Sequence, residues 1–253
     1  MSRPQVLVTG ASRGIGLEIS KKFHSEQFRL HLVAQNRERL TDVVQNYFPG
    51  AMMSPVNLSD EDQVNQWLDS IEEPPDVLVL NAGYALNKPF LETNNSERKT
   101  EFQVNFFTNV QIIKKMLPNM KPGSAIITIG SLTALLPFPG DVHYAASKAA
   151  LYSFMQSLAI EEKDRKIHFG QVLPGFAKTD MTAHVESVLP FHSASEVAES
   201  TWSCYKNKSK IVIPGVINQA NAFLARSFPS LFSTLLEAGI KYLPFPIIPE
   251  NRK

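Results

Sequence analysis

Short apolar runs that end in small residues alternate with amphipathic stretches along this chain, and this alternation limits the folds it can adopt. The apolar runs read PQVLVTG, RLHLVAQ, AMMSPVNLS, DVLVLNAG, SAIITIGS and HFGQVLPG. Helical spacing is seen between them, as with Leu17, Ile19 and Phe23 in GLEISKKFHSEQF. Continuous apolar strands separated by amphipathic helices indicate a parallel sheet covered on both faces. We therefore predict an α/β fold with a single doubly wound parallel sheet.

Composition supports one ordinary folded domain. The chain has 253 residues, of which 43% are hydrophobic and 19% charged, and its net charge is +1. This balance excludes a strongly basic nucleic-acid binder. Cys204 is the only cysteine, and MSRPQVLVTG leaves no room for a signal peptide before the first strand, so we expect a cytoplasmic protein. No repeat or linker divides residues 1–253, and residues 211–253 are interpreted as a C-terminal apolar extension of the same domain.

A glycine-rich turn follows the first apolar run. TGASRGIG places glycines at Gly10, Gly14 and Gly16, just before a helical stretch. Glycine permits a tight turn and lets a ligand approach the backbone closely. The start of the following helix presents unpaired N–H groups to a phosphate. A simple turn would also explain the glycines, but a strand before and a helix after them favour nucleotide binding.

The spacing of this turn resembles that of the short-chain dehydrogenase/reductase family, and three further segments match that family. They are NAG at Asn81–Gly83, Ser131 followed thirteen residues later by the YAASK of Tyr144–Lys148, and PGFAKT at Pro174–Thr179. The matches run in the same order over residues 5–180. The resemblance implies an oxidoreductase with a Rossmann-like fold that binds NAD(P). A Rossmann-like domain without chemistry is the alternative.

Tyr144 and Lys148 carry the chemistry that this resemblance implies. They are four residues apart, so a helix places both side chains on one face, one turn apart. A free tyrosine has a pKa of about 10. A neighbouring ammonium favours the phenolate, so we expect Lys148 to lower the pKa of Tyr144. By resemblance, Tyr144 is the general acid and base, and Lys148 also holds the nicotinamide ribose.

Two further catalytic residues follow from the same resemblance. Ser131 would hydrogen-bond the substrate oxygen, where charge develops during hydride transfer. Asn105 in EFQVNFFTNV matches the helix asparagine that supports a water in a proton relay. Helix packing is the alternative role for Asn105. His143, beside Tyr144, is expected to line the pocket or to pack rather than to act as a base.

The end of the second apolar run favours NADP(H) over NAD(H). NAD-dependent enzymes usually place an acidic residue there to accept hydrogen bonds from the ribose 2′-OH. This chain reads Ala34-Gln35-Asn36-Arg37, without a carboxylate. Arg13 and Arg37 would supply positive charge to a 2′-phosphate. For Arg37 a solvated position at the start of a helix is an equal alternative.

The remaining cofactor contacts also follow from the resemblance. Asn57 would accept a hydrogen bond from the adenine amino group, Asn81–Gly83 would run beside the adenosine ribose, and Thr179 would bind the carboxamide. No metal site is predicted. The predicted cofactor-binding residues are Gly10, Ser12, Arg13, Gly14, Ile15, Gly16, Arg37, Asn57, Leu58, Asn81, Ala82, Gly83, Tyr144, Lys148, Pro174, Gly175, Phe176 and Thr179.

Two segments near the C-terminus are apolar. DMTAHVESVLPFHS is expected to form a flap over an apolar substrate. Beyond KIVIPG, an apolar stripe recurs at helical spacing and breaks near Pro229. No charge-free segment there reaches the roughly 18–20 residues that span a bilayer. A lid over the pocket or a subunit contact is favoured for this stripe, and a helix at a membrane surface is the third interpretation. The stripe consists of Ile217, Leu224, Phe228, Leu231 and Leu235.

The expected function is NADP(H)-dependent interconversion of a carbonyl and a secondary alcohol on an apolar or mid-sized substrate. The alternative is a catalytically idle NADP-binding regulatory protein, against which the intact Asn-Ser-Tyr-Lys set argues. We also expect a homo-oligomer, a dimer or tetramer, because FFTNVQIIKKML and AALYSFMQSLAIEE are apolar over more than one face. A monomer results if the C-terminal extension covers these helices instead.

Overall fold

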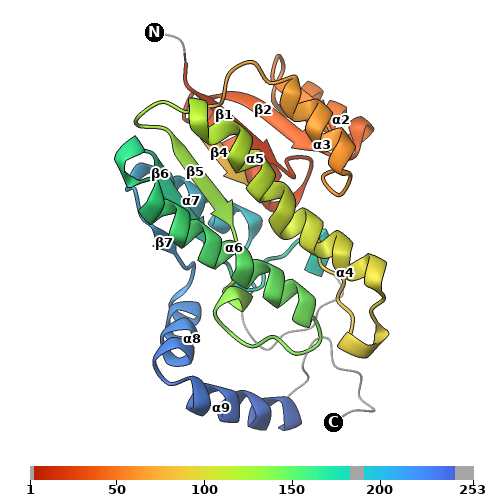
Figure 1. Ribbon diagram of the computed structural model, residues 1–253, viewed down its shortest axis with the longest axis vertical. Coiled ribbons are helices and arrows are strands. Elements are labelled where there is room, and N and C mark those ends of the chain that lie inside the picture. Colours follow the sequence, from red (N-terminus) through yellow and green to blue (C-terminus); the bar gives the residue numbers. More distant parts are fainter. Residues whose placement is uncertain (1–2, 183–190, 243–253) are drawn as a thin grey trace.

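The computed structural model describes residues 3–182 and 191–242, and all of its strands belong to one parallel sheet (Figure 1). In the strand order β3-β2-β1-β4-β5-β6-β7, the strands up to β3 are added on one side of β1 and those from β4 onward on its other side. The switch point of the sheet therefore lies between β1 and β4. Ligands bind at such a switch point, beyond the carboxyl ends of the strands. The strands in spatial order are β3 (Met52–Pro55), β2 (Arg29–Ala34), β1 (Gln5–Thr9), β4 (Val77–Leu80), β5 (Ala125–Ile129), β6 (His168–Val172) and β7 (Ile211–Val212).

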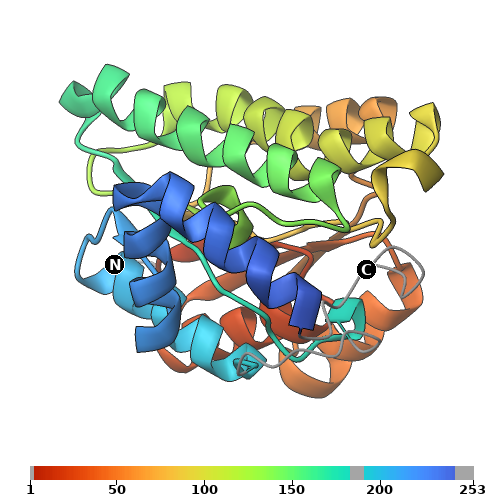
Figure 2. The same cartoon turned by 90° about the horizontal axis from the view of Figure 1, so that it is seen from below.

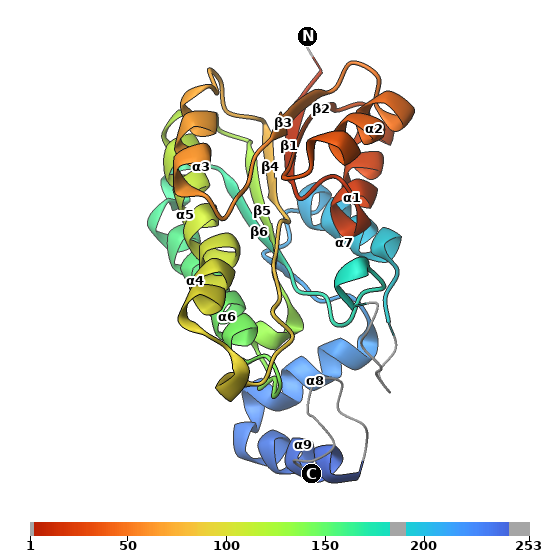
Figure 3. The same ribbon diagram turned by 90° about the vertical axis from the view of Figure 1, so that its right-hand side faces the viewer.

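Helices cover both faces of the sheet, which confirms the predicted fold class (Figure 3). On one side lie α1 (Gly14–Ser25), α2 (Arg37–Tyr47) and α7 (Ala194–Lys206). On the other lie α3 (Glu61–Asp69), α4 (Asn95–Phe102), α5 (Thr108–Met116) and α6 (Val142–Glu161).

Each face has its own apolar core because successive strand side chains point to opposite sides. Val8 packs toward α1 and α7, whereas its neighbour Leu7 packs toward α3 and α5. Every residue of β4 and β5 is buried, as expected for central strands covered on both faces. The core on the α1 side includes Ile19, Phe23, Leu40 and Val197, and that on the α5 side includes Val64, Trp67, Ile112 and Leu151.

The C-terminal extension forms two helices beyond the carboxyl ends of the strands. They are α8 (Val216–Ser227) and α9 (Pro229–Tyr242), and the break falls at Pro229 as predicted. Figure 2 shows both blue helices crossing this end of the molecule. No helix in residues 3–182 and 191–242 is long and apolar enough to cross a membrane.

Much of the apolar stripe on these two helices faces outward. Ile217, Phe228, Leu231 and Leu235 are each exposed over about half of their surface. Along residues 229–239 of α9, no described side chain is fully buried. The extension therefore adds little to the two apolar cores.

Candidate active site

The glycine turn has the geometry of a phosphate cradle. Gly10 and Gly14 adopt left-handed backbone angles, with φ of +68° and +53°. A Cβ on Gly16 would lie 2.2 Å from the carbonyl oxygen of Gly10, so only glycine fits there. Arg13 occupies the N-cap position of α1 without a side-chain cap, and no other described side chain caps this turn. The first N–H groups of α1 are thus left for a ligand.

Asn81 and Thr9 join the ends of the two strands at the switch point. The Asn81 side chain donates to the carbonyl oxygen of Thr9 at 2.9 Å. The backbone N–H groups of Asn81 and Ala82 both donate to the Thr9 hydroxyl at 3.0 Å. These bonds hold the NAG segment against the glycine turn. The two segments pack so closely that a Cβ on Gly10 would come within 2.9 Å of the Asn81 amide nitrogen.

Tyr144 and Lys148 lie on one face of α6, opposite the end of β5. Asp141 caps this helix by accepting a hydrogen bond from the Tyr144 N–H. The Lys148 side chain is buried and donates from Nζ to the carbonyl oxygen of Ile129 at 3.2 Å. Ser131 follows β5, and its hydroxyl accepts hydrogen bonds from the Thr133 N–H at 3.2 Å and the Thr133 hydroxyl at 2.9 Å. It also lies close enough to the half-buried Tyr144 side chain to affect the pKa of the phenol by hydrogen bonding. The structure thus brings together three of the four predicted catalytic residues.

Burial dominates the electrostatics of this pair. It raises the pKa of Tyr144 to about 12, and the hydrogen bond with Ser131 counteracts only part of that effect. Burial likewise lowers the pKa of Lys148 to about 8. The expectation that Lys148 brings the pKa of Tyr144 below its ordinary value was wrong for this structure. Neither the phenolate nor the ammonium is well solvated here, so both groups shift toward their neutral forms.

Asn105 lies behind the cavity rather than in its wall. It belongs to a π-helical turn, Gln103–Phe107, which joins α4 to α5. Its amide nitrogen donates to the carbonyl oxygen of Tyr84 at 2.8 Å and to the Ser147 hydroxyl at 3.0 Å, and its oxygen accepts from the Tyr84 N–H at 2.8 Å. A Cβ on Gly83 would lie 3.5 Å from this oxygen and 3.4 Å from Lys148 Nζ. Asn105 therefore reaches the site from behind Gly83.

One cavity of about 970 Å³ connects these features at the carboxyl ends of the strands. Arg37 is not among the described residues that line it, whereas Arg39, on the same helix, is. Arg39 was not among the residues predicted from the sequence. It is an arginine two residues after Arg37 on α2, so the same argument from positive charge applies to it. Predicted residues in the lining are Gly10, Ser12, Arg13, Gly14, Ile15, Gly16, Asn57, Leu58, Asn81, Ala82, Gly83, Ser131, Tyr144, Lys148, Pro174, Gly175, Phe176 and Thr179.

The far end of the cavity is apolar and is lined partly by the C-terminal helices. The sequence suggested a lid or a subunit contact for these helices but did not indicate which of their residues would line the cavity. Asn218 on α8 packs so closely on Gly175 that a Cβ there would lie 2.7 Å from its amide nitrogen. The lining residues in this part are Leu136, Pro137, Phe138, Leu224, Phe232, Leu235, Leu236 and Gly239. The predicted flap lies mostly in residues 183–190, outside the described residues.

Charged groups also meet across the opening of the cavity. The Arg13 guanidinium forms an ion pair with Asp180 at 2.6 Å, and both side chains are more than half exposed. This pair links the glycine turn to the segment that follows Thr179. Within residues 3–182 and 191–242, no three histidine, cysteine or acidic side chains gather as a metal site would require.

Comparison with known proteins places these features in one family. The family model for short chain dehydrogenases matches residues 4–189. The chain belongs to the short-chain dehydrogenase/reductase family. Members of this family are oxidoreductases that act on CH–OH groups with NAD(P), so the protein is an enzyme of this class. The glycine cradle, in which added Cβ atoms would clash, suits such a dinucleotide.

Individual relatives of this short-chain dehydrogenase/reductase agree with the family match. A 3-oxoacyl-(acyl-carrier-protein) reductase from Rickettsia bellii is 32% identical over 186 residues, covering 72% of this chain and 76% of the relative. Carbonyl reductase (NADPH) 2 from Sus scrofa is 32% identical over 187 residues, covering 72% and 75%. A short chain dehydrogenase from Burkholderia cenocepacia, solved with NADP, is 24% identical and shares the fold with a TM-score of 0.82, covering 93% of this chain and 98% of that one.

Proposed function

We propose that this short-chain dehydrogenase/reductase interconverts a carbonyl and a secondary alcohol on an apolar or mid-sized substrate, with NADP(H) as its cofactor. The observation that carries the proposal is the position of Ser131, Tyr144 and Lys148 in a single cavity that begins at the glycine turn. A catalytically idle regulator would need the glycine turn but not these three groups.

In the proposed reaction, the glycine turn and Lys148 would hold NADPH, which would supply a hydride to the carbonyl carbon. The Ser131 hydroxyl hydrogen-bonds the carbonyl oxygen and stabilises the charge that develops there. Tyr144 donates its proton to that oxygen, which yields the alcohol and leaves a phenolate. Lys148 stabilises this phenolate by its positive charge, because Nζ lies close to the ring. Oxidation of the alcohol follows the same steps in reverse.

The preference for NADP(H) is supported by two arginines. Arg13 and Arg39 both line the cavity near the end of β2, where Gln35 stands in place of a carboxylate. A 2′-phosphate would compete with Asp180 for the Arg13 guanidinium, and guanidinium groups bind phosphate oxygens in pairs. The relative from Sus scrofa carries NADPH in its name.

The preference for an apolar substrate is supported by the far end of the cavity. Phe232, Leu235 and Leu236 of α9 line it, together with Leu136 and Phe138 from the segment that precedes α6. This arrangement favours the lid among the three interpretations of the extension. It would cover the part of a substrate that extends away from Tyr144, so apolar substituents would gain affinity by burial.

Assembly and location are part of the same proposal. The exposed Phe107 on the π-helical turn and Ile160 on α6 favour a homo-oligomer, a dimer or tetramer, that covers this side. Ile113, Leu151 and Met155, which also belong to the predicted contact helices, are instead buried in the core. We expect the protein to work in the cytoplasm, with the half-exposed stripe on α8 and α9 available for contact with a membrane surface.

A panel of carbonyl compounds tests the proposal. Purified protein is mixed with NADPH and with aliphatic and aromatic ketones of increasing size, and the loss of NADPH absorbance is followed. We expect turnover that increases with the apolar surface of the ketone until the cavity is filled. Tight NADPH binding without turnover of any ketone, aldehyde or alcohol in the panel would instead support the idle regulator.

A further inference from the structure

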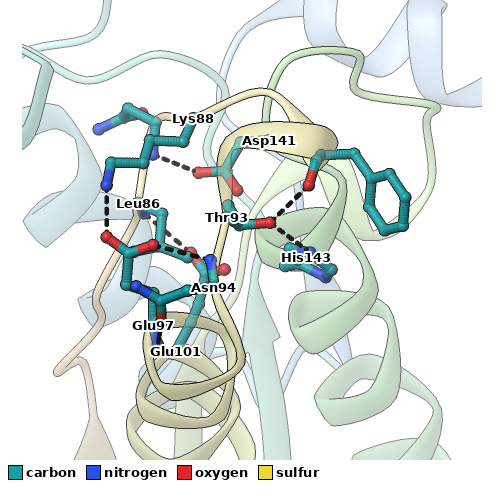
Figure 4. Close-up of polar contacts among 10 residues, drawn as sticks. Leu86, Lys88, Thr93, Asn94, Glu97, Glu101, Asp141 and His143 are labelled. Atoms are coloured by element: carbon teal, nitrogen blue, oxygen red, sulfur yellow. Dashed lines mark hydrogen bonds and ion pairs between the residues drawn. The ribbon is translucent and has the colours of Figure 1, made fainter.

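Three buried side chains hold the loop that leaves β4 and passes behind the active site. Asn105 pairs with both backbone groups of Tyr84. Glu101 Oε1 accepts a hydrogen bond from the Leu86 N–H at 3.0 Å, and Asp141 Oδ2 accepts one from the Asn87 N–H at 2.9 Å (Figure 4). Two of these three groups are carboxyls, which is unusual for a buried cluster.

Glu101 is the least satisfied member of this cluster. Its side chain is completely buried on α4, one helical turn before Asn105. Its second oxygen, Oε2, is also buried, and no described residue gives it a hydrogen bond. An ionised carboxylate with one bare oxygen in such a place is costly, whereas a protonated carboxyl is far less so.

The contacts of Asp141 explain which of the two carboxyls holds a proton. Asp141 accepts N–H donors on both oxygens, from Asn87 and from Tyr144, and it caps the positive end of the α6 dipole. Among the described residues Glu101 has a single donor, the Leu86 N–H. Two nearby carboxyls that cannot both ionise easily share one proton, and the group with more donors gives it up. Burial also raises the pKa of Asp141, but its hydrogen bonds from Asn87 and Tyr144 oppose that effect. The arrangement of donors therefore favours the proton on Glu101.

The other charged groups around Glu101 belong to α6 and to the loop. Burial, followed by the charge of Asp141, raises the pKa of Glu101 to about 8, while the positive charge of Lys148 lowers it by less. The reverse effect also holds, because an ionised Glu101 raises the pKa of Lys148. It raises the pKa of Tyr144 as well.

Other ionisable groups nearby have partners of their own. His143 faces Thr93, with Nε2 3.2 Å from its hydroxyl (Figure 4). Lys88 is paired with Glu97 at the start of α4. Lys148, by contrast, donates to the carbonyl oxygen of Ile129, and among the described residues no carboxylate forms an ion pair with it.

We propose that Glu101 is a positioning residue of the reaction: its buried carboxyl, which has one oxygen without a hydrogen-bond donor among the described residues, keeps the buried Lys148 positively charged as the pH rises. This inference rests on the proposed function, in which the charge of Lys148 supports both Tyr144 and the cofactor ribose. Glu101 acts through Lys148 and touches neither substrate nor cofactor. Its ionisation offsets the loss of the Lys148 proton and extends the alkaline limit of activity.

The variant Glu101→Gln tests this role. Glutamine keeps the acceptor for the Leu86 N–H and resembles the protonated carboxyl, but it cannot ionise. Below about pH 7, kcat/KM for ketone reduction should match that of the unmodified enzyme, because Glu101 is neutral there. Above that range, the alkaline fall of kcat/KM in the variant should begin about one pH unit closer to neutral, since the negative charge of an ionised Glu101 no longer stabilises the protonated form of Lys148. Glu92→Gln, which removes an exposed carboxylate, is the matched control.

Cofactor binding gives a second readout that does not depend on turnover. The pH at which the affinity for NADPH falls should shift in Glu101→Gln in the same direction, because Lys148 would hold the ribose. Glu101→Asp, which keeps a carboxyl, should retain more of the alkaline range than Glu101→Gln. If no carbonyl is reduced, the proposed function fails, and these binding curves still test Glu101.

Two outcomes would overturn the inference. One is that Glu101→Gln and the unmodified protein show the same pH dependence of activity and of NADPH binding. The other is an equal loss for Glu101→Gln at every pH, which indicates only a structural bond to Leu86. Should this variant not fold, carbon NMR of the glutamate carboxyls in the unmodified protein decides. One carboxyl should titrate above about pH 7, and titration of all of them below about pH 6 refutes the inference.

Discussion

Lys148 Nζ lies 5.6 Å from the centre of the Tyr144 ring, one helical turn further along α6. This spacing lets the charge of the lysine act on the phenol without a direct hydrogen bond between them. Because burial raises the pKa of Tyr144 and lowers that of Lys148, the tyrosine holds its proton at neutral pH. A protonated tyrosine is the form that reduction of a carbonyl requires.

Arg39 is expected to distinguish NADPH from NADH. Arg39→Ala should weaken NADPH binding about 10-fold and leave NADH binding nearly unchanged, because only the 2′-phosphate loses a charge-assisted hydrogen bond. Dissociation constants from fluorescence titration provide the measurement. Arg37→Ala is the matched control, since Arg37 is on the same helix but outside the described cavity lining. A larger effect from Arg37 than from Arg39 would contradict this assignment.

Leu236 is expected to contribute to the affinity for large apolar substrates. It lines the cavity from α9, so Leu236→Ala should lower kcat/KM about 5- to 30-fold for a long-chain ketone, in line with roughly 1–2 kcal/mol of lost burial. Small ketones that do not reach α9 should be affected little. Leu231→Ala, on the exposed side of the same helix, is the control. Equal losses for small and large ketones would show that α9 does not act as a lid.

The strands and the order of the site segments could be predicted from the sequence because each depends on local pattern. Apolar runs such as that of β4 are buried on both faces, and Gly16 has no room for a side chain. The two-residue strand β7 was not predicted, since so short a run gives no periodicity. Its pairing with β6 defines it.

What depends on three-dimensional placement could not be predicted. The choice between Arg37 and Arg39 is set by the rotation of α2 about its axis, which the sequence does not reveal. The shift in the pKa of Tyr144 depends on how deeply α6 is buried, and the sequence showed only that Lys148 is near. The break near Pro229 was predicted, but the direction that α9 takes after it, and so its place in the cavity lining, depends on packing.

Phe107 is expected to lie in a contact between subunits. Its ring is about half exposed on the π-helical turn, so a charge there should disrupt an oligomer without disturbing the core. Light scattering on the unmodified protein should give a multiple of 28.2 kDa, and Phe107→Glu should reduce it toward that mass. Leu91→Glu, an exposed apolar residue elsewhere, is the control. A mass of one chain for the unmodified protein would refute the oligomer.

The role of Tyr144 as proton donor is tested most directly by comparing Tyr144→Phe with the unmodified protein. The measurements are kcat for ketone reduction and the dissociation constant of NADPH. Phenylalanine keeps the ring and its packing but has no proton to donate. We expect a loss of about 100-fold or more in kcat, the scale of general acid catalysis, with NADPH affinity nearly unchanged. Retention of most of the kcat by Tyr144→Phe, with the same NADPH affinity, would contradict Tyr144 as the proton donor.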